Sequence, residues 1–254
     1  MNKSLRNSST VRLLRILEEI AKSDDGIGVT ELAQRLDLNK STIYRFLATL
    51  EEEQYLEQEP DTKKYHSGIR LFELASRIVN KVDWTKDIRP FLVDLKDRVN
   101  ETVHLGIIDD HEVVYIDKVE CERSIRMYSK VGKRAPVYCT GVGKAILAFL
   151  PEEKRNHIMN HIHFHPFTEN TITDAAHLKK EIKMIRAQGF ALDREEHELG
   201  VSCTASPIFN YNGKVLGGIS IAGPSSRIDE ERLFDLALEV KETAQFISRR
   251  LGSL

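Results

Sequence analysis

The 254-residue sequence has few cysteines and no long apolar run. Its three cysteines, Cys121, Cys139 and Cys203, are widely spaced and form no Cys-X-X-Cys pair, which excludes a disulfide framework and the common redox motif. No apolar stretch approaches the roughly 18 residues of a bilayer-spanning helix, and the N-terminus lacks the apolar core of a secretory signal. We therefore expect a reduced, cytoplasmic protein without a membrane role.

The chain also lacks a charge excess of either sign. It carries 37 Lys and Arg against 39 Asp and Glu, a formal net charge of −2, so the overall balance does not by itself indicate nucleic-acid binding. The local balance differs, because residues 1–17 contain basic but no acidic side chains, whereas residues 51–61 are strongly acidic. The length suffices for two ordinary domains, each with its own core, and we expect two.

Residues 29–56, VTELAQRLDLNKSTIYRFLATLEEEQYL, have the pattern of two helices joined by a tight turn. Thr30 and Asn39 are the candidate N-caps. In the second helix the apolar residues follow the i, i+3, i+4, i+7 rule, so its hydroxyl and basic side chains must point outward. Such a face suits a recognition helix, in which an arginine binds a guanine edge in the major groove. An ordinary helical hairpin is the alternative.

A predicted helix from Thr10 to Ala21 precedes this pair, and a short hairpin around Pro60-Asp61-Thr62 follows it. Three helices followed by a hairpin make a winged helix-turn-helix domain, which we assign to residues 1–67. Its candidate DNA-binding residues combine the outward face of the second helix with nearby basic and hydroxyl side chains. They are Arg12, Thr30, Lys40, Ser41, Thr42, Tyr44, Arg45, Lys63 and Lys64.

Residues 68–82 are predicted to form a linker helix with an apolar stripe at Leu71, Leu74 and Ile78. An apolar stripe between two domains needs a partner surface. In a DNA-binding protein the obvious partner is the same helix of a second subunit. We therefore expect a homodimer or homotetramer on a palindromic DNA operator.

Residues 83–254 have the pattern of an α+β domain, which typically encloses a small pocket. The strongest hairpin signal is Asn212-Gly213, since both residues tolerate positive φ. Strands are predicted at 102–109, 112–119, 124–130, 203–211 and 214–222, and helices at 84–99, 139–149, 152–160, 175–188 and 233–251.

The segment CTGVGKAILAF, residues 139–149, runs from two glycines into a small-residue helix. Backbone N–H groups at such a helix start are bare and favour an anion. The glycine spacing is not that of a P-loop, so nucleotide hydrolysis is not predicted.

Four histidines, His157, His161, His163 and His165, crowd into one segment. The first two lie one helical turn apart, a spacing that can bind zinc. The segment lacks the glutamate of an HExxH zincin, and a polar helix end and loop is the simpler interpretation. We expect no metal.

Cys203 is a conceivable nucleophile, with Asp193, Glu196 and His197 nearby in the sequence. Closeness in sequence is not geometry, however, and no pair of these residues completes a mechanism. We therefore expect no catalytic residues and no cofactor.

The order of these parts resembles the IclR (isocitrate lyase regulator) family of transcription factors along essentially the whole chain. The motifs that carry the resemblance are VTELAQRLDLNKSTIYRFLATL, ETVHLGIIDDHEVVYIDKVE, APVYCTGVGKAILAF, GFALDREEHELGVSCTASPIF and GGISIAGPSSRI. The resemblance implies a winged-helix domain, a linker helix and, over residues 83–254, a GAF-like domain that binds a small organic acid. The second motif is similar to regulators of the KdgR subgroup, which answer to 2-keto-3-deoxygluconate.

The resemblance also implies which residues bind the acid. It places the acid at Gly141 and Val142 of the helix start, beside Asp193, Cys203 and Ser220. The apolar wall is Met127, Ala135 and Val201. Where glyoxylate- and pyruvate-binding relatives have a second serine, this chain has Ala222. The lost hydroxyl argues against a glyoxylate-like effector. We expect a hydroxylated acid that donates a hydrogen bond to Asp193.

Together these patterns predict a transcriptional regulator, with repression as the expected sign, whose operator affinity a small organic acid controls. The alternative is a metabolic enzyme, or a ligand-sensing module that does not bind DNA directly.

Overall fold

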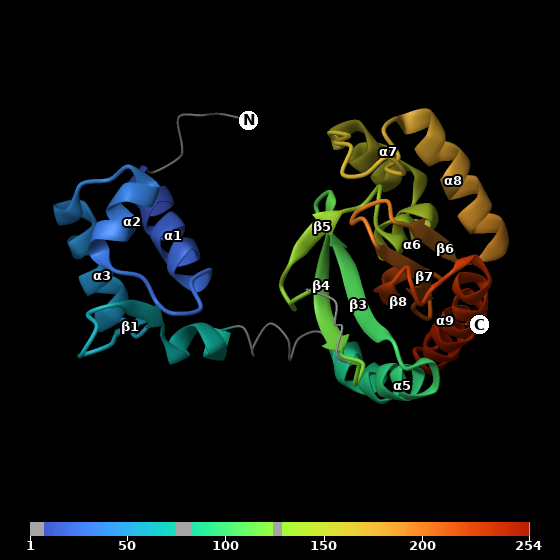
Figure 1. Cartoon of the computed structure of the whole chain (residues 1–254), viewed down its shortest axis with the longest axis horizontal. Helices are drawn as coiled ribbons and strands as arrows, with labels where there is room; N and C mark the ends of the chain where they lie inside the picture. Colours follow the sequence, from blue (N-terminus) through green and yellow to red (C-terminus); the bar gives the residue numbers. More distant parts are fainter. Residues whose placement is uncertain (1–7, 75–82, 124–128, 254) are drawn as a thin grey trace. The chain divides into compact units, whose positions relative to one another are not determined.

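The computed structural model describes residues 8–74, 83–123 and 129–253. The chain divides into two compact units, Met1–Asp83 and Trp84–Leu254 (Figure 1). Among the described residues, no helix is both long and apolar enough to cross a bilayer.

The first unit is a winged helix-turn-helix, which confirms the predicted fold. It comprises α1 (Ser8–Ala21), α2 (Val29–Leu36), α3 (Lys40–Glu52) and the antiparallel pair β1 (Leu56–Gln58) and β2 (Tyr65–Ser67). One face of each helix supplies the core, as the apolar spacing predicts. The central buried residues are Ile16, Ile20, Leu32, Ile43, Phe46, Leu47, Leu50, Leu56 and Tyr65.

The helix starts in this unit differ from the sequence expectation. Thr30 is not the cap of α2 but its second residue, and Gly28 is the N-cap. The reason is that the preceding residue, Ile27, pairs in an antiparallel bridge with Tyr65, which holds the chain extended up to Gly28. Asn39 is the N-cap of α3, although its side chain accepts no cap hydrogen bond.

Thr10, where the first helix was predicted to begin, lies inside α1, which starts at Ser8. The linker helix is described only from residue 69 to residue 74. In this stretch Leu71 is half-buried and Leu74 is 37% exposed, while Ile78 lies outside the described residues.

In the described part of the second unit, six strands form one sheet in which all neighbours are antiparallel, in the order β5-β4-β3-β8-β7-β6. The strands are β3 (Thr102–Asp109), β4 (Glu112–Val119), β5 (Arg134–Pro136), β6 (Ala191–Arg194), β7 (Val201–Phe209) and β8 (Val215–Pro224). The strand predicted at 124–130 falls mostly outside the described residues, and β5 is the described strand that pairs with the outer side of β4.

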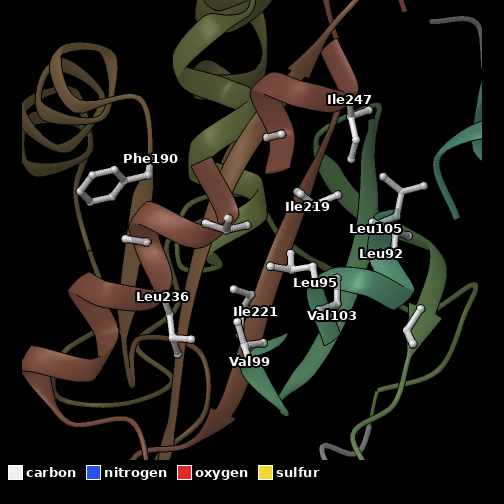
Figure 2. Packing of buried hydrophobic residues seen from close by; sticks show 14 of the residues in the cluster. Leu92, Leu95, Val99, Val103, Leu105, Phe190, Ile219, Ile221, Leu236 and Ile247 are labelled. Carbon is white, nitrogen blue, oxygen red and sulfur yellow. The ribbon is translucent and has the colours of Figure 1, made fainter. Parts of the chain in front are cut away.

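Helices cover both faces of this sheet (Figure 1). They are α5 (Asp83–Val99), α6 (Gly141–Phe149), α7 (Glu152–His161), α8 (Ala175–Gln188) and α9 (Glu230–Arg250). One apolar cluster fills the space between the sheet, α5 and α9, where Leu92, Leu95, Ile219, Ile221 and Ile247 meet (Figure 2). A second cluster joins α6, α7 and α8 to the opposite face.

Strand alternation places polar side chains on the α6 face. Val103 and Leu105 of β3 belong to the α5/α9 cluster, so the intervening His104 faces the other way. In β8, Ile219 and Ile221 likewise leave Ser220 on the α6 side. The sequence therefore marks one region of the α6 face as polar although it is buried.

Candidate functional site

The outward face of α3 is the first candidate site. Ile43, Phe46, Leu47 and Leu50 are buried, and the first turn contains no acidic residue. The remaining side chains are available to a partner, because Lys40, Ser41, Tyr44 and Arg45 are exposed and Thr42 is half-buried. This combination of hydroxyls, basic groups and a helix N-terminus suits phosphate and base-edge contacts.

Arg45 lies over the neighbouring Phe46 ring, with its guanidinium carbon 5.5 Å from the ring centroid. This cation–π contact limits the freedom of a long side chain that is otherwise exposed.

The other predicted DNA-binding residues differ in how accessible their side chains are. Arg12 and Thr30 are exposed. Lys63 is exposed at the tip between β1 and β2, where it adopts φ 57°. Lys64 is half-buried, and its Nζ donates to the Asp25 carbonyl oxygen at 3.4 Å. Lys63 is therefore the better placed of the two lysines to meet a phosphate.

The second candidate site is a cavity between the sheet and the start of α6. Residues that pair on neighbouring strands form the floor of this cavity. Asp193 of β6 pairs with Cys203 of β7, and Cys203 pairs with Ala222 of β8. His104 pairs with Ser220 on the neighbouring strands. All five residues line one cavity of about 60 Å³. A buried water needs about 10 to 15 Å³ of such space, so the cavity accommodates a few waters or a compact polar molecule.

The α6 start enters the cavity at Gly141. A side chain here would fill the site, because a Cβ at Gly141 would lie 3.0 Å from the Cys203 sulfur and 3.7 Å from the Asp193 Cβ. Backbone N–H groups of Gly141 and Glu196 hydrogen-bond to the Asp193 carboxyl, and each lowers its pKa. The helix start predicted to be bare thus already faces a carboxyl group of the chain itself.

His104 forms a buried, uncharged part of the floor. Burial, followed by the charge of Lys118, lowers its pKa to about 3. Its Nε2 lies 2.6 Å from the Ser129 hydroxyl oxygen, and its ring lies 5.1 Å from the ring of Tyr115. A neutral imidazole can both donate and accept hydrogen bonds, so this floor can bind hydroxyl and carbonyl groups.

A buried ion pair supports the cavity from behind. Lys144 of α6 has no exposed side-chain surface and forms an ion pair with Glu196 and a second one, at 3.3 Å, with Glu181 of α8. The loop that carries Glu196 is also held by the hydroxyls of Thr168 and Thr171, which donate to backbone carbonyls of Glu195 and Glu196 at 2.6 Å each. These bonds fix the loop that brings His197 and Glu198 to the cavity.

Six of the eight predicted effector-binding residues line this cavity: Ala135, Gly141, Asp193, Val201, Cys203 and Ser220. Val142 is not among the lining residues, because its side chain packs toward Gly106 and Gly218 of the sheet. Met127 lies outside the described residues.

The sequence interpretation missed several lining residues, and for some a signal existed. His104 interrupts an apolar strand, which marks a buried polar position. Tyr115 follows the same alternation in β4. Ser129 and Lys133, from the segment before β5, carried no such signal. Ala222, the position of the missing second serine, also lines the cavity, and the lining residues that were not predicted are His104, Tyr115, Ser129, Lys133, Thr140, His197 and Glu198.

Cys203 is poorly suited to act as a nucleophile. Burial, followed by the charge of Asp193, raises the pKa of the Cys203 thiol, so the reactive thiolate is disfavoured.

The histidine-rich segment does not assemble a ligand set. The rings of His157 and His161 are tilted against each other with centroids 4.5 Å apart, and Nδ1 of His161 lies 2.8 Å from the His157 carbonyl oxygen. In the part of the chain that the structure describes, no three His, Cys, Asp or Glu side chains are grouped to hold a metal ion.

Comparison with known proteins assigns both candidate sites to domains of one protein family. The family model described as IclR helix-turn-helix domain matches residues 9–60, and the model described as Bacterial transcriptional regulator IclR C-terminal matches residues 76–249. The chain belongs to the IclR family. It is therefore a DNA-binding transcriptional regulator rather than an enzyme, and its C-terminal IclR domain binds a small-molecule effector.

Individual IclR-family relatives match over nearly the full length. The HTH-type transcriptional regulator KdgR of Escherichia coli (strain K12) is 36% identical over 245 residues, 96% of this chain and 93% of that protein. XynR of the same strain is 33% identical over 96% of this chain and 97% of its own length. The crystal structure of the Thermotoga maritima IclR covers 97% of this chain and 100% of its own, with 37% identity and a TM-score of 0.82.

Proposed function

We propose that this IclR-family chain is a cytoplasmic repressor whose affinity for an operator falls when a small hydroxy or keto acid occupies the cavity. The observation that carries the proposal is the pairing of an exposed, basic α3 face with a largely buried polar cavity in a separate unit. Repression is supported by relatives that bear this name, among them the Transcriptional repressor IclR of Escherichia coli (strain K12), 32% identical over 97% of this chain.

The effector class follows from the groups that line the cavity. Gly141 offers close approach to a helix N-terminus, where negative charge is favoured. His104 and Ser220 offer hydrogen bonds to a hydroxyl or carbonyl group. Ala222 supplies no hydroxyl, so we propose an acid other than glyoxylate, with 2-keto-3-deoxygluconate as a named candidate.

A thermal-shift screen of small keto, hydroxy and sugar acids tests this proposal. A true effector stabilises the folded state by mass action, by about 2.7 kcal/mol at one hundred times its Kd. Stabilisation by one compact hydroxylated acid supports the class. Stabilisation by none of the acids would remove the cavity from consideration as an acid site.

Arg45→Ala should weaken specific DNA binding by about 1 to 3 kcal/mol, because a guanidinium that forks onto a guanine edge is lost. Binding to random duplex should suffer less. The measurement is a gel-shift titration with a duplex that the full-length chain selects from a random pool, beside a scrambled duplex of the same composition.

Arg186→Ala is the matched control, since Arg186 is an exposed arginine on α8 of the other unit. It should leave both titrations unchanged. A specificity ratio that Arg45→Ala does not alter would show that α3 is not the DNA-reading helix.

We also propose that the helix that begins near residue 69 joins two copies of the chain on a two-half-site operator. Leu71→Asp together with Leu74→Asp should then give monomers in sedimentation and weaken binding to the paired site. The exposed face of the same helix provides the control Arg70→Ala, which should remain dimeric. Dimers that survive the double substitution would place the interface elsewhere.

A further inference from the structure

The cavity wall and the ion pair behind it together contain more buried negative than positive charge. Lys144 shares its single ammonium group between Glu196 and Glu181. Asp193 takes part in no ion pair with any described residue, although it is only 6% exposed. Glu196 is buried as well, and its Oε2 has no hydrogen-bond partner in the described part of the chain. Among the described residues, the single buried ammonium group behind the cavity therefore faces three carboxyl groups, while the exposed Lys133 lies in the lining itself.

Several elements present titratable or charged groups toward Asp193. The N–H groups of Glu196 and Gly141, which are neutral donors, hydrogen-bond to the Asp193 carboxyl. The remaining groups come from β3, β4, β7, α6, α8 and the loops on either side of the cavity. They are His104, Tyr115, Lys133, Cys139, Lys144, Glu181, Glu196, His197, Glu198 and Cys203.

An acidic effector brings a further negative charge into this wall. Like charges on buried groups repel strongly, because little water screens them. A carboxylate bound at Gly141 would lie beside Asp193, since a Cβ at Gly141 would itself be 3.7 Å from the Asp193 Cβ. Two ionised carboxylates this close would repel each other, and the repulsion favours protonation of one of them.

We propose that the cavity binds its acidic effector together with one proton, which Asp193 takes from solvent and uses to donate a hydrogen bond to the effector carboxylate. This inference rests on the proposed function, because it presumes an acidic effector. It reverses the role expected for Asp193 from the sequence, which was to accept a hydrogen bond from an effector hydroxyl.

The acid–base properties of Asp193 agree with this role. Burial, followed by the charge of Glu196, raises its pKa to about 7, while Lys144 and the two N–H groups oppose the rise. A protonated carboxyl group is therefore accessible near neutral pH without any conformational change.

The pH dependence has a definite sign. Below pH 7 Asp193 already carries the proton in the free protein, so affinity should be level. Above pH 7 the proton must be taken up on binding, and affinity should fall by about tenfold for each pH unit. Binding through an ionised Asp193 that accepts from a hydroxyl would give no such fall.

Calorimetry on the full-length chain tests the proposal, with pyruvate and 2-keto-3-deoxygluconate as the acids. Titrations at pH 6 and pH 8 in two buffers of different ionisation enthalpy should give proton uptake near zero at pH 6 and near one at pH 8. Asp193→Asn, which retains a donor but cannot titrate, should bind equally at both values. Glu231→Gln, an exposed carboxyl on α9, is the control and should behave as the wild type.

Infrared spectroscopy of the ligand-free chain separates this inference from the proposed function. The inference is supported by a carboxylic acid band that disappears as pH rises through about 7 and that Asp193→Asn lacks. This band can be observed even if neither acid binds. Failure of both acids to bind would count against the proposed acid class. Tight binding of either acid at pH 8 without proton uptake would overturn the inference while sustaining the proposed function. Absence of the band in the ligand-free chain, together with acid binding that takes up no proton at either pH, would overturn it as well.

Discussion

Lys144→Met should lower the free energy of unfolding of the C-terminal unit by about 3 to 5 kcal/mol, because removal of one partner from a buried ion pair leaves the other charge uncompensated. The side chain of Lys144 is fully buried and that of Glu196 is 9% exposed, so water cannot replace the lost ammonium. Denaturant unfolding, followed by circular dichroism, measures the change.

The double variant Lys144→Met with Glu196→Gln is the matched control. It removes both charges while it keeps the side-chain volumes similar, so much of the lost stability should return. A single variant as stable as the wild type would show that the ion pair contributes little. If the double variant is no more stable to unfolding than the single variant, the loss of stability comes from altered packing and not from the unpaired charge.

Gly141→Val should abolish stabilisation by the effector and the response of DNA binding to it. A Cβ at this position already lies 3.0 Å from the Cys203 sulfur and 3.5 Å from the Ala205 Cβ, so the added methyl groups of valine must occupy the cavity. DNA affinity without effector should change little, since the α3 face lies in the other unit. Thermal shift and gel shift with the acid identified by screening provide the two readouts.

Gly28→Ala provides a glycine control, because a Cβ there meets nothing within 4 Å. It should keep the full effector-induced shift. An effector that binds Gly141→Val with wild-type affinity would require a different site, for example near the histidines at residues 161–165.

Patterns that depend on near neighbours in the sequence were predictable. The Asn212-Gly213 signal identified the β7–β8 hairpin, where Gly213 adopts φ 69°. Gly189 ends α8 at φ 84°, as a left-handed C-cap glycine should. The apolar spacing of α3 gave the buried face and, by difference, the outward one.

Features that depend on distant residues were not predictable. The Lys144–Glu196 pair joins positions 52 residues apart, and no local pattern connects them. The cap of α2 was misplaced at Thr30 because the Ile27–Tyr65 bridge that fixes the helix start is a tertiary contact. The charge state of Asp193 depends on its burial and on Glu196, which only the folded loop brings together.

Fluorescence anisotropy of the full-length chain on the selected duplex, with and without the stabilising acid, tests most directly whether effector binding and DNA binding are coupled. We predict that saturating acid weakens DNA binding by about 5- to 150-fold, the usual range of such coupling, and that Asp193→Ala binds the duplex normally but no longer responds. Equal affinity with and without the acid, or an undiminished response in Asp193→Ala, would contradict the proposed coupling.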